Sequence, residues 1–178
     1  WNKDGDITIW TSTQGTFSVR TASAMILGVP VSSIKVVPME IGGGFGGKIP
    51  VYLEPVAIAL SRKAHRPVKV VMSREDVFRA SGPTSGTKVR MKIGARADGT
   101  LTAASASLYY EAGAYKGSPA GAGAMCALAA YKIPNFFIEA YDIVVNRPKV
   151  AAYRAPGSPS STFATESIMD EIARRLNI

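Results

Sequence analysis

The sequence predicts an α+β fold in which mixed β-sheets pack against helices. Several short segments alternate apolar and polar residues, which is typical of strands. Other segments repeat apolar residues every three or four positions and end at Gly or Pro, which is typical of helices. The two kinds of segment do not follow one another in a strict βαβ order, and this favours α+β over α/β.

In the first half of the chain, we expect strands at residues 7–11, 34–39 and 67–72, and helices at residues 17–27 and 53–64. The first helix ends where Gly and Pro follow its last apolar residue. An apolar stripe along the second helix predicts which of its faces is buried. The stripe consists of Leu53, Val56, Ala57, Leu60 and Ala64.

In the second half, residues 87–96 alternate apolar side chains with Lys and Arg, which predicts a strand with one wet face. Asp98 and Gly99 then indicate a hairpin turn into a partner strand at residues 101–111. A further strand is expected at residues 136–145. Helices are expected at residues 124–131 and 163–176, the latter with Ile168, Met169, Ile172 and Leu176 facing inward.

The composition is that of a globular domain, with 178 residues, 47% of them hydrophobic and 19% charged. The one Cys, Cys126, and the one His, His65, exclude a disulfide within the chain, a thiolate metal cage and a multi-histidine metal site. No apolar run approaches the ~20 residues of a membrane span. The chain opens on Trp1 without a signal peptide. We therefore expect residues 1–178 to be a single, partial domain of a longer polypeptide, with cytoplasmic placement as the default.

The net charge of +8 permits an anionic partner but does not require one. The densest basic stretch, residues 62–66, falls where a helix should end, and cations suit a helix C-terminus. Basic and aromatic residues do not interleave as they do in RNA-binding proteins, so no nucleic-acid partner is expected.

The most informative segment is the glycine loop, defined as residues 42–48, which places five glycines around Phe45 and ends at Lys48. Glycines let the backbone approach a ligand closely, and successive free N–H groups can bind an oxyanion. Two chemical interpretations are open. From Gly42 to Lys48 the loop fits a nucleotide P-loop, but Ile49 replaces the Ser or Thr that would bind Mg²⁺. Alternatively, the loop approaches another ligand or serves close packing.

The glycine loop also resembles the glycine-rich motif of the xanthine oxidase and aldehyde oxidase family of molybdenum hydroxylases. Other segments of the chain resemble motifs of the same family in the same order, over essentially the whole length. They are residues 12–14, 66–69, 73–76, 111–115, 131–135 and 153–157. One such motif alone would be weak evidence for the family, whereas the agreement of all of them in order and spacing is specific to it.

The resemblance implies that the chain binds part of a molybdopterin cofactor, in its cytosine dinucleotide form. Because the pterin holds the metal in this family, no Cys or His ligand is needed. Gln14 would donate a hydrogen bond to an oxygen ligand of the metal, and Phe45 and the backbone of Arg154 would lie near the metal. The implied cofactor-binding residues are Gln14, Gly43, Gly44, Phe45, Gly46 and Arg154.

At the substrate positions the sequence departs from the purine-hydroxylating members of the family. Their Glu, Arg and aromatic substrate contacts correspond here to Ile49, Ala122 and Pro156. The pocket walls implied by the resemblance, with Phe45 as the fourth, are therefore apolar. This favours an aldehyde or an aromatic N-heterocycle as substrate. Ala155, where carbon monoxide dehydrogenases of the family carry Cys, disfavours copper–molybdenum chemistry.

The family reaction hydroxylates a carbon with water as the oxygen source and uses a Glu as general base. The Gly-Glu motif of that base is absent, and none of the carboxylates near the expected site matches it. They are Glu40, Glu54, Glu111 and Glu166. We therefore expect no catalytic residue in these 178 residues and no activity of the chain alone. Expected partners are the rest of the molybdopterin-binding polypeptide and an iron–sulfur subunit with [2Fe-2S] clusters. The sequence leaves open whether an FAD subunit is a further partner.

Two other classes of function stay open on the residues alone. One is a phosphate- or nucleotide-binding module that uses the glycine loop. The other is a structural or interaction domain in which the glycines serve close packing of the backbone.

Overall fold

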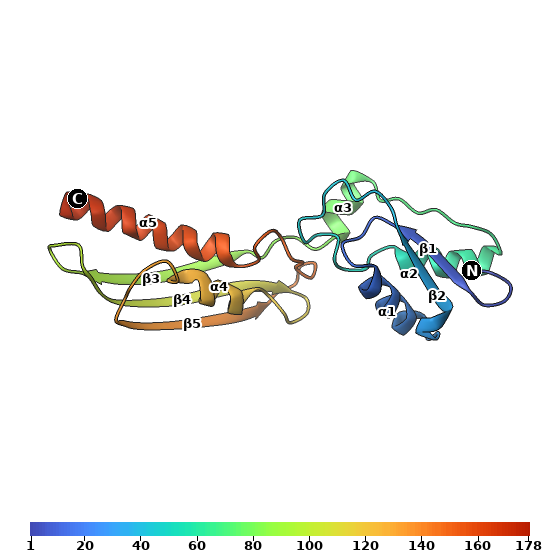
Figure 1. Ribbon diagram of the computed structural model, residues 1–178, viewed down its shortest axis with the longest axis horizontal. Coiled ribbons are helices and arrows are strands. Elements are labelled where there is room, and N and C mark those ends of the chain that lie inside the picture. The colour runs from blue at the N-terminus through green and yellow to red at the C-terminus, as the bar shows by residue number, and fades with distance from the viewer. The chain divides into compact units, whose positions relative to one another are not determined.

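The computed structural model describes residues 1–178 and divides into two units, Trp1–Ser81 and Gly82–Ile178. Figure 1 shows the elements of each unit. Helices and strands combine in a mixed arrangement, which confirms the predicted α+β class. No helix combines the length and the hydropathy that a membrane span requires.

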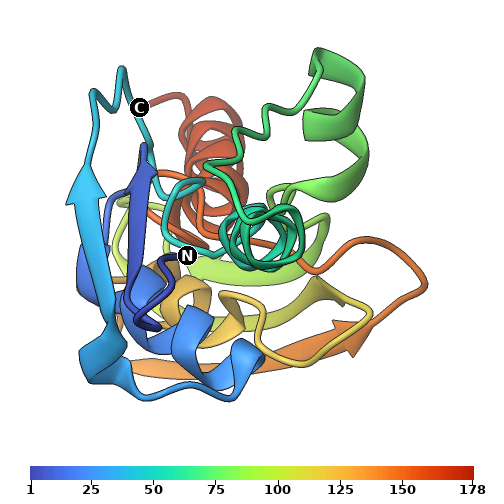
Figure 2. The same cartoon turned by 90° about the vertical axis from the view of Figure 1, so that its right-hand side faces the viewer.

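The first unit is built on a βαβ motif. Strand β1 (Ile7–Thr11) leads through α1 (Thr16–Leu27) and the short 3-10 helix η1 (Val31–Ser33) into β2 (Ile34–Pro38). The two strands pair in parallel, and both arrows point the same way in Figure 2. As predicted, α1 ends at a glycine, Gly28, in the left-handed conformation.

Two further helices complete this unit, and here the sequence-based expectations need correction. Helix α2 (Glu54–Ala64) does not bury the predicted stripe, because Val56 and Leu60 are 49% and 44% exposed. The buried residues of this helix are Pro55, Ile58 and Ser61. The N-terminal amino group donates a hydrogen bond to Ser61 Oγ, so the face that carries Ser61 lies inward. Only part of the predicted face is therefore covered.

Residues 67–72 form no strand, contrary to prediction, because no segment of the chain pairs with them. Val71 in this segment is 73% exposed. The next residues form α3 (Arg74–Ala80), which was not predicted. Its start is marked by a capping box, in which Ser73 Oγ accepts from the N–H of Asp76 and the Asp76 carboxylate accepts from the N–H of Ser73.

The second unit contains a three-stranded sheet in the order β3, β4, β5. Strands β3 (Thr87–Ala95) and β4 (Leu101–Gly113) form the predicted antiparallel hairpin, and β5 (Asn135–Val144) pairs with β4 in parallel. Helices α4 (Ala120–Ala127) and α5 (Ser158–Leu176) pack against the sheet. The buried core includes Leu108 and Tyr110 of β4.

Both helices of the second unit begin earlier than predicted. Helix α4 starts four residues before the expected position because Ala and Gly let it pack close to β4, where Gly123 faces Tyr110. Helix α5 starts five residues early because Pro159 is tolerated in the first turn. The expected inward residues of α5 are partly buried, and Ser161 and Thr165 are its fully buried residues.

Candidate functional site

The parallel pairing of β1 and β2 brings two loops together in the first unit. Both loops follow the carboxyl ends of their strands, and such ends lie at the same edge of a parallel sheet. The backbone N–H of Gln14 donates to the carbonyl of Lys48 at 3.0 Å, and Thr13 Oγ1 donates to the same carbonyl at 3.1 Å. The fold therefore joins Gln14 to the glycine loop.

The Gln14 side chain is oriented by the glycine loop. Its Oε1 accepts hydrogen bonds from the backbone N–H groups of Gly46, at 2.8 Å, and Lys48, at 3.2 Å. Its Nε2 donates to no other group of the chain. An amide whose oxygen is bound in this way must present its N–H donors away from the loop. Gln14 is thus a fixed, exposed donor.

The first half of the glycine loop presents further donors. The backbone N–H groups of Gly42, Gly43, Gly44 and Phe45 donate to no acceptor within the chain. The φ angles of Gly42, Gly43 and Phe45 are positive, at 61°, 115° and 50°. Successive amides in such conformations can form a concave donor array for an anionic or strongly polar group.

Two of the glycines leave room for specific side chains. A Cβ on Gly44 would lie 2.5 Å from Gln14 Oε1, and a Cβ on Gly43 would lie 2.8 Å from Cε2 of Phe45. The Gln14 amide and the Phe45 ring therefore rest directly on the backbone of the loop. Phe45 itself is 60% exposed, so its ring is available to a ligand.

Lys48 does not project from the loop as a P-loop lysine would. Its Nζ donates to Ser12 Oγ at 2.9 Å and to the carbonyl of Ile41. Helix α2 begins at Glu54, so no helix starts at the lysine. Lys48 instead ties the two ends of the loop together, and the P-loop arrangement of a projecting lysine at the start of a helix is not formed.

The second predicted loop, residues 153–157, lies in the second unit and is called the arginine loop. The hydroxyl of the fully buried Tyr110 donates to the carbonyl of Gly157 at 2.8 Å. A Cβ on Gly157 would lie 2.5 Å from the carbonyl oxygen of Pro119 and 2.7 Å from the nitrogen of Gly123. The end of this loop is therefore packed against the start of α4.

The structure distributes the predicted site residues over both units. Gln14, the loop glycines, Phe45 and Ile49 belong to the first unit, and Ala122, Arg154 and Pro156 to the second. Arg154 and Pro156 are exposed on the arginine loop, and Ala122 is exposed on α4 beside Gly123. No group of three or more His, Cys, Asp or Glu side chains could hold a metal ion. The roles of these residues at a cofactor stay predictions.

Sequence reasoning missed the residues that hold the two loops. Lys48 was noted only as part of a motif, and Ser12 and Tyr110 were not singled out. Tyr110 carried a usable signal, because it falls on the apolar face of β4, where a buried hydroxyl requires a partner. Lys48 carried no such signal in the sequence, because its partners are known only once the loops that follow β1 and β2 are placed beside each other.

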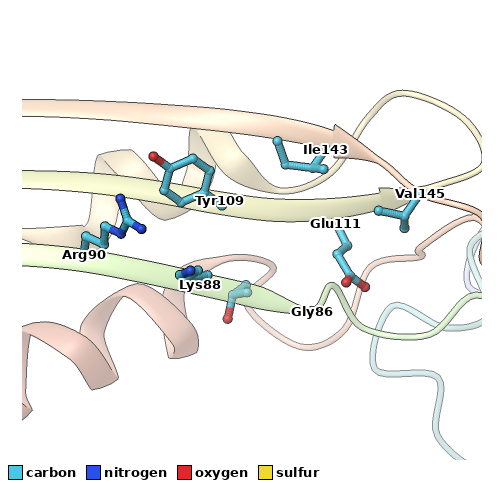
Figure 3. A pocket seen from close by; sticks show the side chains of 8 residues that line it. Gly86, Lys88, Arg90, Tyr109, Glu111, Ile143 and Val145 are labelled. Carbon is cyan, nitrogen blue, oxygen red and sulfur yellow. The ribbon is translucent and has the colours of Figure 1, made fainter.

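A separate hollow of about 600 Å³ lies in the second unit, on the face of the sheet opposite to α4 and α5 (Figure 3). Its wall contains Lys88, Arg90, Tyr109, Glu111 and Ile143 among others. None of the predicted cofactor- or substrate-binding residues lines it.

Comparison with known proteins identifies the class to which this fold and site belong. The profile of the molybdopterin cofactor-binding domain family matches residues 1–178. The xanthine dehydrogenase molybdenum-binding subunit of Escherichia coli O157:H7 is 35% identical over 179 residues, which cover 98% of this chain and 24% of that protein.

Two solved structures agree with this class. Quinoline 2-oxidoreductase from Pseudomonas putida 86 superposes with a TM-score of 0.86 at 28% identity, covering 96% of this chain and 23% of the other. Aldehyde oxidoreductase from Desulfovibrio gigas superposes with a TM-score of 0.85 at 25% identity, covering 99% of this chain and 20% of the other.

The chain belongs to the molybdopterin cofactor-binding domain family. The resemblance to the xanthine oxidase and aldehyde oxidase family is thereby confirmed. The chain spans 24% and 13% of the length of the first two curated relatives that it matches. Activity, substrate and partners of a complete enzyme are therefore matters for proposal.

Proposed function

We propose that this chain forms part of the molybdenum-cofactor-binding portion of an oxidoreductase that hydroxylates aldehydes or N-heterocycles with water as the oxygen source. The observation that carries this proposal is the set of unpartnered donors at the glycine loop. Four successive backbone N–H groups and the Gln14 amide offer free donors on one segment, whereas the N–H groups of Gly46, Gly47 and Lys48 are hydrogen-bonded within the chain. A strongly polar cofactor with several oxygen acceptors fits such a segment.

The residues proposed to contact the cofactor are those named from the sequence. The backbone from Gly43 to Gly46 would lie against the cofactor, because an added Cβ at Gly43 or Gly44 would displace Phe45 or Gln14. Gln14 Nε2 would donate to an oxygen near the metal, and Phe45 and Arg154 would lie close to the metal without ligating it. The proposed cofactor is molybdopterin in its cytosine dinucleotide form.

When bound, the cofactor would supply the two-electron oxidation that the hydroxylation requires. The role of this chain is to orient the cofactor and to donate hydrogen bonds to it. Gln14 holds an uncharged donor in place, and Lys48 closes the loop so that its amides stay aligned. A preorganised donor array stabilises developing negative charge without reorganisation during the reaction. We assign the general base to a glutamate outside these 178 residues.

The proposed substrate follows from the apolar character of the four residues that the family resemblance assigns to the substrate pocket. Phe45, Ile49, Ala122 and Pro156 offer no charged or amide group to a purine. Ile49 is 45% exposed and so can contact a ligand. An aldehyde or an N-heterocycle without the polar pattern of xanthine suits such walls. High purine-hydroxylase activity of the complete enzyme would contradict this assignment.

The proposal also extends to organisation and partners. We infer that residues 1–178 act as one partial molybdopterin-binding domain that needs the remaining segments of its polypeptide. We further infer [2Fe-2S] clusters on a partner subunit or domain, with FAD as an additional carrier. The chain alone is then inactive, and stoichiometric molybdenum in the purified chain would contradict this.

A pair of substitutions at Gln14 tests the central role in the complete enzyme. Gln14→Glu keeps an oxygen acceptor for the amides of Gly46 and Lys48 but removes the N–H donor. We expect molybdenum and pterin content to persist, while kcat falls on the order of 10²-fold, as for other preorganised donors. Gln14→Ala also removes the contacts that hold the loop, so cofactor content should fall as well. Unchanged kcat in Gln14→Glu, at full cofactor content, would contradict the proposal.

A further inference from the structure

In the sheet of the second unit, helices cover one face of the central strand β4 and leave its other face open. Ala106, Leu108 and Tyr110 of β4 point toward the helices and are buried. On the neighbouring β5, side chains of the opposite face are open to solvent, with Phe137 64% and Ile143 37% exposed. The open face thus carries large apolar side chains that nothing in the unit covers.

One edge of the open face carries a row of cations. Lys88, Arg90 and Lys92 alternate along β3 and are all exposed. Successive side chains on one face of a strand stand about 6.6–6.8 Å apart. No carboxylate of the chain lies within ion-pair distance of any of the three. The row therefore presents three positive charges at strand spacing without a counter-charge.

The carboxylates on the same face already have partners. Glu111 forms an ion pair with Arg147 at 3.0 Å. Glu139 accepts hydrogen bonds from Ser107 Oγ at 2.6 Å and from the Tyr141 hydroxyl at 2.9 Å. These two hydrogen bonds, with the Ser107 bond the stronger influence, hold the pKa of Glu139 below its usual range. The hydroxyl donors leave the negative charge of Glu139 in place, so the face keeps this one unpaired anion beside the three unpaired cations of the row.

The hollow connects the cation row to the apolar side of the face. In Figure 3, Lys88 and Arg90 stand on β3, Tyr109 lies on the central strand, and Ile143 and Val145 mark the far side. The ring of Tyr109 stacks on that of Tyr141 with centroids 5.0 Å apart, so the centre of the surface is ordered in advance. A ligand in the hollow would meet positive charge on one flank and apolar side chains on the other.

We propose that this open face, from the β3 cation row to Ile143 on β5, is the docking surface for a separate acidic polypeptide. Its docked segment would direct alternating carboxylates toward β3 and apolar side chains into the hollow. Charge complementarity selects this occupant. The first unit carries 10 Lys and Arg against 6 Asp and Glu, and a second copy of the chain has a net charge of +8, so neither complements the row. This inference goes beyond the proposed function and does not rest on cofactor binding.

The test uses the complete polypeptide that contains these 178 residues, in which a face covered by its remaining segments would bind nothing. The probe is a labelled synthetic peptide of strand length in which glutamates alternate with leucine and tyrosine. Fluorescence anisotropy is measured for the wild-type chain and for the double variant Lys88→Glu with Arg90→Glu. We expect saturable binding by wild type and at least about tenfold weaker binding by the variant. Hydrogen exchange should show protection of β3 and β5 amides on binding.

A matched control variant carries the same change of charge elsewhere. Lys132→Glu with Arg174→Glu alters the segment after α4 and the last turn of α5, and it should bind the peptide as wild type does. Circular dichroism and thermal unfolding confirm that both variants fold. Equal binding by the two variants, or no binding by wild type, would overturn the proposal.

Two further outcomes would also overturn it. An oligonucleotide of equal charge that binds as tightly as the peptide would make the face a general polyanion surface. Self-association of wild type in sedimentation velocity, lost in Lys88→Glu with Arg90→Glu, would assign the face to a second copy of the chain.

Discussion

The glycine loop and the arginine loop both contain an unfavourable backbone conformation, and different contacts stabilise it in each loop. Each contains a residue other than Gly with positive φ, Phe45 at 50° and Ala155 at 55°. Such a conformation costs on the order of 1–2 kcal/mol and persists only where the surroundings impose it. The two loops differ in what imposes it.

Polar contacts at an accessible surface hold the glycine loop. Gln14 Oε1 and Lys48 Nζ supply its cross-links, and Gln14 itself is exposed. Burial holds the arginine loop, because the buried Gly157 meets the start of α4 and the wholly buried Tyr110 binds its carbonyl. Packing against a core tolerates less change than exposed hydrogen bonds do. The glycine loop should therefore adapt to a ligand, while the arginine loop should behave as a fixed support.

The largest expected effect is at Gly157. Gly157→Ala would place a Cβ 2.5 Å from the carbonyl oxygen of Pro119, at a φ of 86° that disfavours any side chain. We expect a loss of about 3 kcal/mol or more in the free energy of unfolding, measured by urea denaturation.

Gly42→Ala is the matched control in the other loop. Gly42 also has positive φ, at 61°, but an added Cβ there meets nothing within 4 Å. Its cost should be about 1 kcal/mol, from the backbone conformation alone. If the two variants lost equal stability, the contrast between a packed and an open loop would be wrong.

Tyr110→Phe tests the buried hydroxyl directly. The substitution keeps the ring but removes the donor to Gly157 and the hydrogen bond shared with Ser160 Oγ at 3.1 Å. We expect a loss of about 1–2 kcal/mol in the free energy of unfolding, because buried polar groups lose a partner. Tyr109→Phe, on the open face of the same strand, is the control and should change stability little.

The elements that local patterns specify were predictable from the sequence. Strand β1 and helix α1 follow from periodicity and from Gly28, and the hairpin of β3 and β4 from alternation and the turn at Gly99. The strand predicted at residues 67–72 was wrong because apolar, β-branched composition indicates a strand only where another strand can pair with it. The prediction of which face of α2 is buried was wrong because Ser61, a small polar residue, faces inward and accepts a hydrogen bond from the N-terminal amino group.

The candidate site was only partly predictable. The glycine loop stood out by composition, and Gln14 and Arg154 came from the family resemblance. The contacts that hold the loops were hidden, because they join residues far apart in the chain. Tyr110 lies 47 residues before Gly157, and Lys48 lies 36 after Ser12. Such pairs depend on strand pairing and helix docking, which no local pattern encodes.

A smaller effect is expected from Lys48→Met. Methionine keeps a long apolar stem but cannot donate to Ser12 Oγ or to the carbonyl of Ile41. We expect a loss of about 1 kcal/mol in stability, because the lysine contacts are part-buried. Hydrogen exchange should rise at Gly46 and Lys48, whose amides depend on the same closed loop. Unchanged exchange there would show that Gln14 alone holds the loop.

The smallest effect is the coupling between Ser12 and Lys48 in a double-mutant cycle. Ser12→Ala removes one acceptor of Lys48 Nζ but leaves the carbonyl of Ile41. The coupling between Ser12→Ala and Lys48→Met should be about 0.5 kcal/mol, since a part-buried pair at an accessible surface contributes little. The equivalent cycle for Tyr110→Phe and Ser160→Ala, two residues that support the end of the arginine loop from β4 and α5, should give a larger value, because Tyr110 is fully buried. A reversal of that order would mean that the glycine loop is the more rigid of the two, and that it receives its ligand without adapting.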